Sequence, residues 1–139
     1  MNKRSKAPQQ PKLKANRKLT PKVEPKISVS LQYLTKGKDH NFDYFSAKDF
    51  RTKAQAFEQL LEFLRRLTAK TLLAISSLPK DVDCGFEQLP FQQMKFKPDG
   101  IKLGQDAKIH VFRFGNGGNY RLLGFFEYDV LQIIGFDFN

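Results

Sequence analysis

Two arginines in the last third of the chain have the type and spacing to bind a phosphate. Arg113 and Arg121 lie on either side of the glycine-containing segment 116–119, which is typical of a tight turn between two antiparallel strands. If Phe114 faces Tyr120 across this hairpin, Arg113 lies directly opposite Arg121 on one face of the sheet. Like charges in this position are destabilising unless an anion lies between them, and guanidinium groups bind phosphate oxygens in pairs.

A structural alternative to a phosphate site stays open for these arginines. One of them can form an ion pair with Glu127, with Asp137 or with a carboxylate on a helix. The register of the hairpin can also shift by one residue, which would place the two guanidinium groups on opposite faces of the sheet. The pairing of Arg113 with Arg121 is therefore a hypothesis about register as well as about chemistry.

Several residues near the hairpin are candidates to assist the arginines. Lys95 and Lys97 lie on a segment that alternates apolar and basic residues, and we expect them to help hold a phosphate. Lys102 and Tyr120 are expected to contact nucleic acid, the lysine through its charge and the tyrosine by stacking on a base. His110 is expected on the face opposite the arginines, where a structural role is the alternative to a general base.

The hairpin belongs to a strand-rich final third of the chain. Turns are predicted at residues 116–119 and 128–129, and an earlier strand at residues 27–33, where apolar and polar residues alternate. Residues 79–91 are expected to be irregular. Three segments rich in β-branched and aromatic residues predict an antiparallel meander: residues 108–114, 120–127 and 130–138.

Two helices are predicted between the first strand and the meander. Ser46, followed by Asp49 three residues later, resembles a capping box and predicts the start of the first helix. A shorter helix at residues 69–77 ends before Pro79. The face of the first helix that packs on the sheet is predicted from an apolar stripe with helical spacing: Phe50, Ala54, Phe57, Leu60, Leu61, Leu64 and Leu67. The sequence thus predicts an α+β fold with one N-terminal strand, a two-helix hairpin and a three- to four-strand antiparallel meander.

The positive charge is concentrated at the N-terminal end of the chain. Of the net charge of +10, residues 1–26 contribute +8 and residues 27–139 only +2. The first segment has few large apolar side chains and four prolines, so we expect a disordered basic arm followed by a folded domain. Such an arm either binds polyanions such as RNA or is a solubilising leader. If it binds RNA, the contacts are expected from its central basic residues: Lys12, Lys14, Arg17 and Lys18.

The remaining composition excludes several classes of site. A single cysteine, Cys84, rules out an internal disulfide and is more typical of a structural thiol than of a nucleophile. Two distant histidines and no cysteine pair predict no metal site and no cofactor. No apolar run approaches the roughly 20 residues that cross a bilayer, and the N-terminus lacks the apolar core of a signal peptide. We therefore expect a cytoplasmic protein.

The final third of the chain resembles the RelE/ParE toxin superfamily. The resemblance rests on I-H-V-F-R-F-G at residues 109–115, G-N-Y-R-L-L-G-F-F at residues 118–126 and V-L-Q-I-I-G-F at residues 130–136. Members commonly open the middle strand of the meander with a Tyr-Arg or His-Arg pair, and Tyr120-Arg121 stands at that position. The resemblance extends over about residues 27–139 and does not reach the arm.

The resemblance implies a toxin-like endoribonuclease of phage or prophage origin that cleaves mRNA in the ribosomal A site, with an antitoxin as protein partner. Arg121, Arg113, Lys95 and Lys97 would be its catalytic residues and would stabilise the charge on the phosphorane. Members often carry a His-Tyr pair at the end of the last strand, whereas residues 136–139 read F-D-F-N. The alternative is a non-catalytic binding protein, either a phage-type inhibitor or an adaptor for nucleic acid or protein. ParE-type members act on gyrase instead of RNA.

Overall fold

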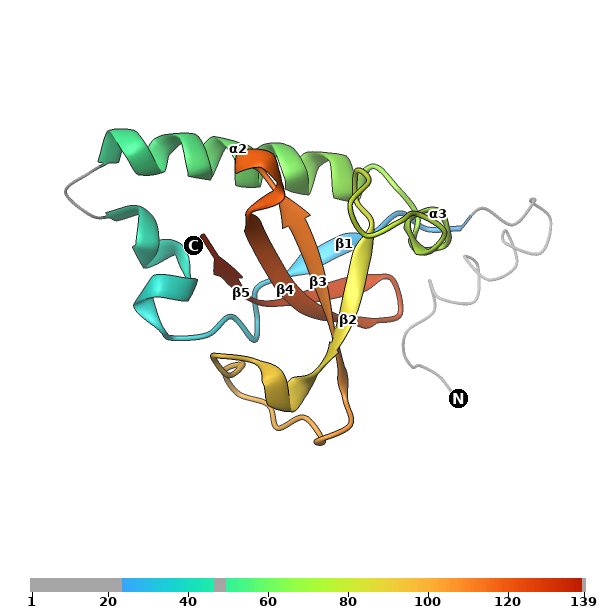
Figure 1. Ribbon diagram of the computed structural model, residues 1–139. Coiled ribbons are helices and arrows are strands. Elements are labelled where there is room, and N and C mark those ends of the chain that lie inside the picture. The colour runs from blue at the N-terminus through green and yellow to red at the C-terminus, as the bar shows by residue number, and fades with distance from the viewer. Residues whose placement is uncertain (1–23, 47–49, 139) are drawn as a thin grey trace, which may run out of the picture.

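A five-stranded mixed sheet forms the centre of the molecule, and helix α2 (Phe50–Thr68) lies across one of its faces (Figure 1). The computed structural model describes residues 24–46 and 50–138. The strands are β1 (Ser28–Ser30), β2 (Phe86–Pro90), β3 (Lys108–Phe114), β4 (Tyr120–Glu127) and β5 (Val130–Asp137). Their order in the sheet is β1-β5-β4-β3-β2. The α+β class predicted from the sequence is confirmed.

The predicted meander is present, with its predicted register. Strands β3, β4 and β5 pair antiparallel in chain order, and Phe114 pairs with Tyr120, so that Arg113 faces Arg121. The turns match the sequence signals, since Gly117 has a positive φ of 67°, a conformation that glycine adopts without steric cost. The register alternative, in which the arginines lie on opposite faces, is therefore wrong.

The two outer strands differ from the prediction. Residues 79–91 were expected to be irregular, but β2 lies within them and pairs antiparallel with β3. This strand has no clear alternation and ends in Pro90, so its strand conformation depends on the partner that it pairs with. Strand β1 is shorter than the predicted 27–33 and pairs parallel with β5, so the sheet is mixed.

The two helices are present, with shorter bounds than predicted for the second. Helix α2 spans Phe50–Thr68 and α3 spans Leu72–Ser76. The hydroxyl of Thr71 accepts a hydrogen bond from the Ala74 N–H (3.1 Å) and caps α3, which satisfies one of its orphan donors. The predicted cap of α2 involves Asp49, which lies outside the described residues. Two short 3₁₀ helices, η1 (Lys38–His40) and η2 (Phe42–Ser46), precede α2.

The face that α2 turns toward the sheet is rotated from the predicted stripe. Phe57 and Leu61, predicted as core, are 38% and 49% exposed. From residue 53 onward, where the structure describes the side chains of the helix, the buried positions are Ala56, Leu60, Phe63 and Leu67. They follow i, i+4, i+7 and i+11 spacing, which also makes a continuous stripe. The prediction is thus confirmed for Leu60 and Leu67 and wrong for Phe57 and Leu61. The error arose because α2 is apolar over a wide arc and because Phe63 was omitted from the stripe.

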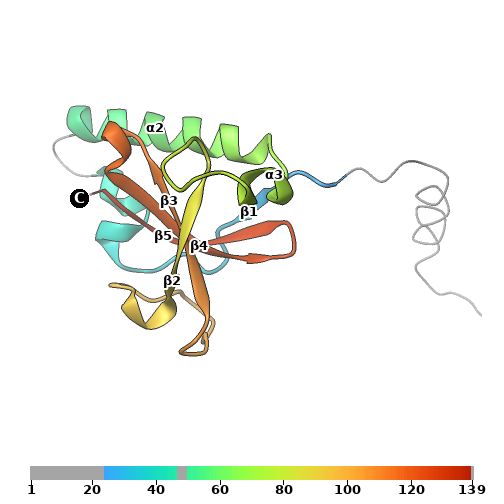
Figure 2. The ribbon, with the colours of Figure 1, turned by 45° about the vertical axis from the view of Figure 1, so that its right-hand side comes forward.

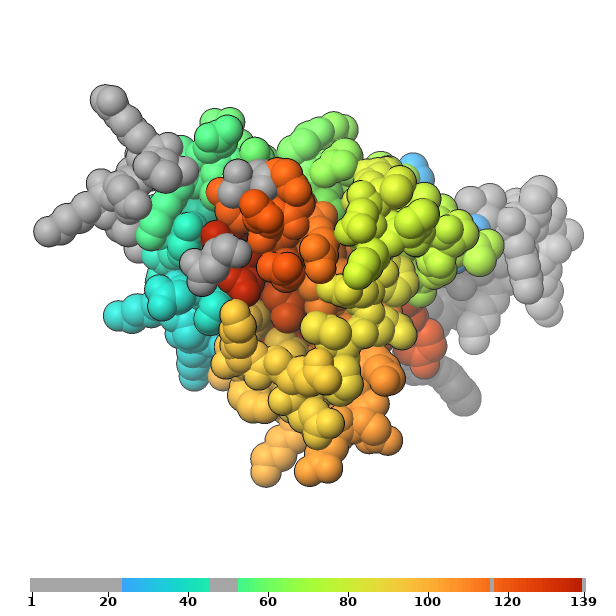
Figure 3. All heavy atoms as spheres, in the orientation of Figure 1, coloured from blue at the N-terminus to red at the C-terminus, as the bar shows by residue number. Residues whose placement is uncertain are grey.

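Apolar side chains cover both faces of the sheet. The main core lies between α2 and the sheet, while a second cluster on the opposite face packs under residues 91–103. Figure 3 shows this segment, in yellow and orange, at the opposite end of the molecule from α2. The second cluster contains Met94, Phe96, Ile109, Val111, Leu123 and Ile134. The strands are thus sandwiched between the helix and an irregular segment.

The described chain starts beside α3, near β1 (Figure 2). The Glu24 carboxylate accepts a hydrogen bond from the Leu73 N–H (3.2 Å), and Lys26 forms an isolated β-bridge with Thr71. The chain therefore already contacts the domain before the predicted boundary at residue 27. Residues 1–23 of the predicted arm lie outside the described residues. Within the described ranges, none of the helices has the length and apolar character needed to cross a membrane.

Adjacent leucines in α2 test which face of the helix is core. Leu60 is fully buried and Leu61 is 49% exposed. Leu60→Ala is expected to lower the free energy of unfolding by about 2–5 kcal/mol because it leaves a cavity. The matched variant Leu61→Ala should change it by about 0.5 kcal/mol or less. Urea unfolding followed by circular dichroism measures both, and equal losses would contradict the assigned face.

Candidate functional site

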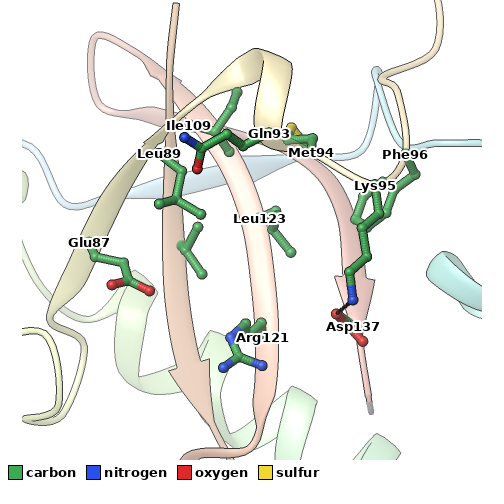
Figure 4. Close-up of a pocket in the computed structure, with 11 residues that line it drawn as sticks. Glu87, Leu89, Gln93, Met94, Lys95, Phe96, Ile109, Arg121, Leu123 and Asp137 are labelled. Atoms are coloured by element: carbon green, nitrogen blue, oxygen red, sulfur yellow. Dashed lines mark ion pairs between the residues drawn. The ribbon is translucent and has the colours of Figure 1, made fainter.

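A pocket of about 300 Å³ lies on the face of the sheet opposite α2 (Figure 4). Its floor is apolar and comes from the second cluster, while charged side chains stand around the rim. Small-molecule sites commonly combine an apolar lining with a few converging polar groups. The rim residues are Glu87, Gln93, Lys95, Arg121 and Asp137.

Arg121 and Lys95 are the two predicted catalytic residues that line this pocket. Arg121 projects from the middle strand β4, between Glu87 and Asp137 in Figure 4. Its Nη1 donates to the carbonyl oxygen of Asn119 (3.5 Å), and among the described residues its guanidinium forms no ion pair with a carboxylate. The guanidinium therefore retains donors for a ligand anion. Lys95 reaches the pocket from the segment after η3 (Phe91–Gln93), and 75% of its side chain is exposed.

Arg113 is beside the pocket but is held by a carboxylate. Its Nη2 donates to Oε1 of Glu87 at 3.3 Å, and Glu87 also contacts Nζ of Lys80 at 3.4 Å. Burial raises the pKa of Glu87, but the hydrogen bonds from Arg113 and Lys80 outweigh it, so that the pKa lies below its ordinary value. The ion-pair alternative for one arginine is thus realised, although with Glu87 on β2 and not with the carboxylates named from the sequence. A catalytic role for Arg113 stays a prediction.

A β-bulge in β5 brings Asp137 to the pocket. Leu123 pairs with Gly135 and Gly124 pairs with Ile133, so Ile134 is an extra residue opposite β4. An inserted residue reverses the alternation of side chains beyond it. Ile133 belongs to the α2-side core, whereas Asp137 faces the pocket with Arg121 as its cross-strand partner. Without the bulge, the odd-numbered Asp137 would point into the core beneath α2.

Gly135 allows the wall of the pocket to pack against the bulge. A Cβ at this position would overlap the ring of Phe96 and come within 2.9 Å of the carbonyl oxygen of His40. The His40 ring stacks on Phe96 with centroids 4.2 Å apart, and its Nδ1 lies 2.8 Å from the carbonyl oxygen of Phe136. Phe96 and the adjacent Lys95 are therefore fixed against β5 because glycine leaves room for the aromatic ring.

The structure does not bring the other predicted site residues to the pocket. The ammonium of Lys97 lies over the Phe91 ring, 4.5 Å from its centroid, and Lys102 is exposed in the loop before β3. Tyr120 packs on Phe138 within the core cluster on the α2 side. The predicted arm contacts lie outside the described residues: Lys12, Lys14, Arg17 and Lys18.

His110 lies on the face opposite the arginines, as predicted. Its ring packs between Phe86 and Phe126, with centroid distances of 4.6 and 5.0 Å, and its Nε2 lies 3.2 Å from the side-chain nitrogen of Gln88. Burial lowers its pKa below the ordinary value of 6.5. Among the described residues its Nδ1 has no hydrogen-bond partner. The imidazole is therefore a structural group on the side of the sheet away from the pocket.

Cys84 is a structural thiol. It is fully buried in the α2-side core, and burial together with the adjacent Asp83 carboxylate raises its pKa to about 11. Because the thiolate is the nucleophilic form of cysteine, this side chain is not a candidate nucleophile.

Glu87 and Asp137 were not predicted as site residues. The sequence carried a signal for Asp137, because two consecutive apolar residues, Ile133 and Ile134, are followed by Gly135 in a strand. Such a pattern is typical of a bulge, and it would have predicted the change of face. No comparable signal exists for Glu87. Within the described ranges, no group of three or more His, Cys, Asp or Glu side chains could hold a metal ion.

Comparison of the chain with protein-family models, with curated proteins and with solved structures finds no match in any of the three. The resemblance to the RelE/ParE superfamily therefore stays a prediction, and a functional proposal depends on the geometry and charges of the pocket.

The lowered pKa of His110 predicts a loss of stability in mild acid. When the pH falls below 6.5, the unfolded chain binds a proton at this histidine before the folded protein does, so the free energy of unfolding decreases until the folded-state pKa is reached. Urea midpoints at pH values from about 7.5 to about 5.5 should fall for the wild type and fall less for His110→Phe. Parallel curves for the two proteins would show that His110 is not the titrating group.

Proposed function

We propose that the protein is an endoribonuclease that binds mRNA in the pocket and cleaves it with cationic stabilisation of the scissile phosphate. In this proposal the substrate is presented in the ribosomal A site, an antitoxin is the regulatory partner, and the protein acts in the cytoplasm. In this proposal Arg121 stabilises the negative charge on the scissile phosphate, and Lys95 assists it.

The observation that supports the proposal is the placement of Arg121. Its guanidinium lies at the rim of a pocket, opposite Arg113 on the neighbouring strand, and forms no ion pair among the described residues. A cation held in a partly buried position interacts more strongly with an anion than one in water. The apolar floor beside it gives a nucleobase a surface to pack on, so that one nucleotide could fill the pocket.

The proposed chemistry needs positive charge where negative charge develops. In RNA cleavage by the ribose 2′-OH, the phosphate passes through a phosphorane that carries extra negative charge on its oxygens. Donors already aimed at those oxygens stabilise that state without reorganising. Arg121 fits this role, and Lys95 lies near enough to contact the same nucleotide. Arg113 could contact the phosphate only if its ion pair with Glu87 breaks.

A second candidate is a non-catalytic binding protein, and the charge balance of the pocket favours it. Among the residues that line the pocket, the negative charges of Glu87 and Asp137 offset the positive charges of Lys95 and Arg121. Such a surface suits a polar protein or peptide as well as RNA. Binding of RNA without cleavage, and without growth arrest on expression, would favour this candidate.

Expression in bacteria tests the enzymatic proposal. The wild-type chain is expected to arrest growth and cleave mRNA within open reading frames, as read by primer extension. Arg121→Ala should lower the cleavage rate by about 10²–10³-fold, because one charge-stabilising donor is lost, and growth should resume.

Arg65→Ala is the matched control. Arg65 lies on α2, on the other side of the sheet, with an exposed side chain paired to Glu62, so its loss should leave the arrest intact. Normal growth during strong expression of soluble wild-type protein would contradict a toxin-like nuclease.

Removal of the basic arm tests whether it binds RNA. Residues 1–23 hold eight lysines and arginines and no acidic residue. Their deletion is expected to weaken RNA binding and to flatten the dependence of log Kd on log salt, because fewer counterions are released. A full-length variant with all eight replaced by Gln separates charge from length and should behave like the deletion. Identical affinity and salt dependence in all three proteins would identify the arm as a passive leader.

A further inference from the structure

A carboxylate lies beside the proposed phosphate-binding arginine. Asp137 is the cross-strand partner of Arg121 and lines the same pocket. It is only 8% exposed, whereas most surface aspartates are freely solvated. Its Oδ2 lies 3.8 Å from Nζ of Lys95, the third charged group on this side of the pocket. Figure 4 shows Lys95 meeting Asp137, with Arg121 on the adjoining strand of the same face.

The backbone fixes this arrangement from two sides. The bulge at Ile134 turns Asp137 toward the pocket, and Gly135 lets Phe96 pack against β5, which brings Lys95 within reach of the carboxylate. Side chains of cross-strand neighbours project from the same face of a sheet, side by side. Arg121 and Asp137 line the same pocket, so the two can contact a phosphate oxygen and the adjacent ribose hydroxyl of a single nucleotide.

We propose that Asp137 is the general base that removes the proton of the ribose 2′-OH, and that Lys95 is the acid that protonates the leaving group. This inference rests on the proposed ribonuclease function and assigns the two proton transfers that the function requires. In this assignment the base lies on β5 and the acid on the segment after η3.

The reaction balances with the groups present. Asp137 accepts the 2′-OH proton while the 2′ oxygen forms a bond to phosphorus, and Arg121 binds the non-bridging oxygens of the phosphorane. The bond from phosphorus to the 5′ oxygen then breaks, and the departing oxygen takes a proton from the Lys95 ammonium. The products are a 2′,3′-cyclic phosphate and a 5′-hydroxyl. Proton exchange with water restores Asp137 and Lys95, and no oxidant or metal is consumed.

A purely structural role for Asp137 is the competing explanation. In that case the carboxylate only holds Lys95 and neutralises Arg121. The two roles differ in what an isosteric change does. Asp137→Asn keeps the shape and the capacity to accept a hydrogen bond but removes the basic oxygen, so a general base is lost while the pocket is retained.

The test uses the full chain and an RNA oligonucleotide, offered both free and in the A site of programmed ribosomes. The single-turnover rate of cleavage by Asp137→Asn is expected to fall by about 10²–10⁴-fold. Its Kd for the same oligonucleotide with a 2′-deoxy substitution at the cleavage site should equal that of the wild type. Asp137→Glu keeps a carboxylate and should recover part of the rate, which also covers the case in which the Asn variant does not fold.

A substrate with sulfur in place of the bridging 5′ oxygen separates the base from the acid. A thiolate leaves without protonation, so this substrate should restore cleavage by Lys95→Ala and should not restore cleavage by Asp137→Asn. Asp129→Asn is the matched control, because Asp129 lies in the turn at the far end of the β4–β5 hairpin and does not line the pocket. It should cleave at the wild-type rate.

The outcomes separate the inference from the function on which it rests. Cleavage by Asp137→Asn at the wild-type rate overturns the assignment of the base and leaves the ribonuclease proposal standing. Recovery of Asp137→Asn on the sulfur substrate places the carboxylate on the leaving-group side and also overturns it. If the wild type binds RNA but cleaves neither form, the ribonuclease proposal fails and the inference fails with it.

Discussion

One extra residue in β5 determines which side chains meet at the pocket. Beyond the bulge at Ile134, the alternation of the strand is reversed relative to β4. Phe136 and Phe138 therefore enter the core beneath α2, and Asp137 joins Arg121 on the other face. Both results have the same cause, so a change that removed the bulge would place a charge in the core and a phenylalanine in the pocket. The stability of the core and the composition of the site are thus coupled through the local register of two strands.

The charges on the pocket face show how a sheet accommodates two adjacent arginines. Arg113 and Arg121 face one another across β3 and β4, which is unfavourable in isolation. The outer strand β2 supplies Glu87 to Arg113, and β5 supplies Asp137 opposite Arg121. The repulsion is relieved by one ion pair at the edge, and the central guanidinium keeps its donors. A phosphate that binds Arg121 from solvent would further reduce the repulsion between the two arginines.

Local sequence patterns predicted the meander well because its strands carry strong signals. Alternating and aromatic residues located three strands, and the turn at residues 116–119 fixed the pairing of Arg113 with Arg121. The sheet-facing side of α2 was predicted only in part, since leucines and phenylalanines surround much of that helix and only the partner sheet selects Phe63 over Phe57. Strand β2 was missed because its conformation depends on β3. The site was predicted in part. Arg121 and Lys95 line the same pocket, whereas Glu87 reaches it through a strand pairing that no local pattern encodes.

The parallel pairing of β1 with β5 has a consequence for how the chain is made. Ser28 pairs with Val130, so the first described strand joins the sheet by pairing with the last one. During synthesis, β1 and the adjacent Ile27 have no strand to pair with until β5 has left the ribosome, after almost all of the described chain. Contacts so distant along the chain are slow to form because a large loop must close first. Closure of this domain is therefore expected only after β5 has left the ribosome.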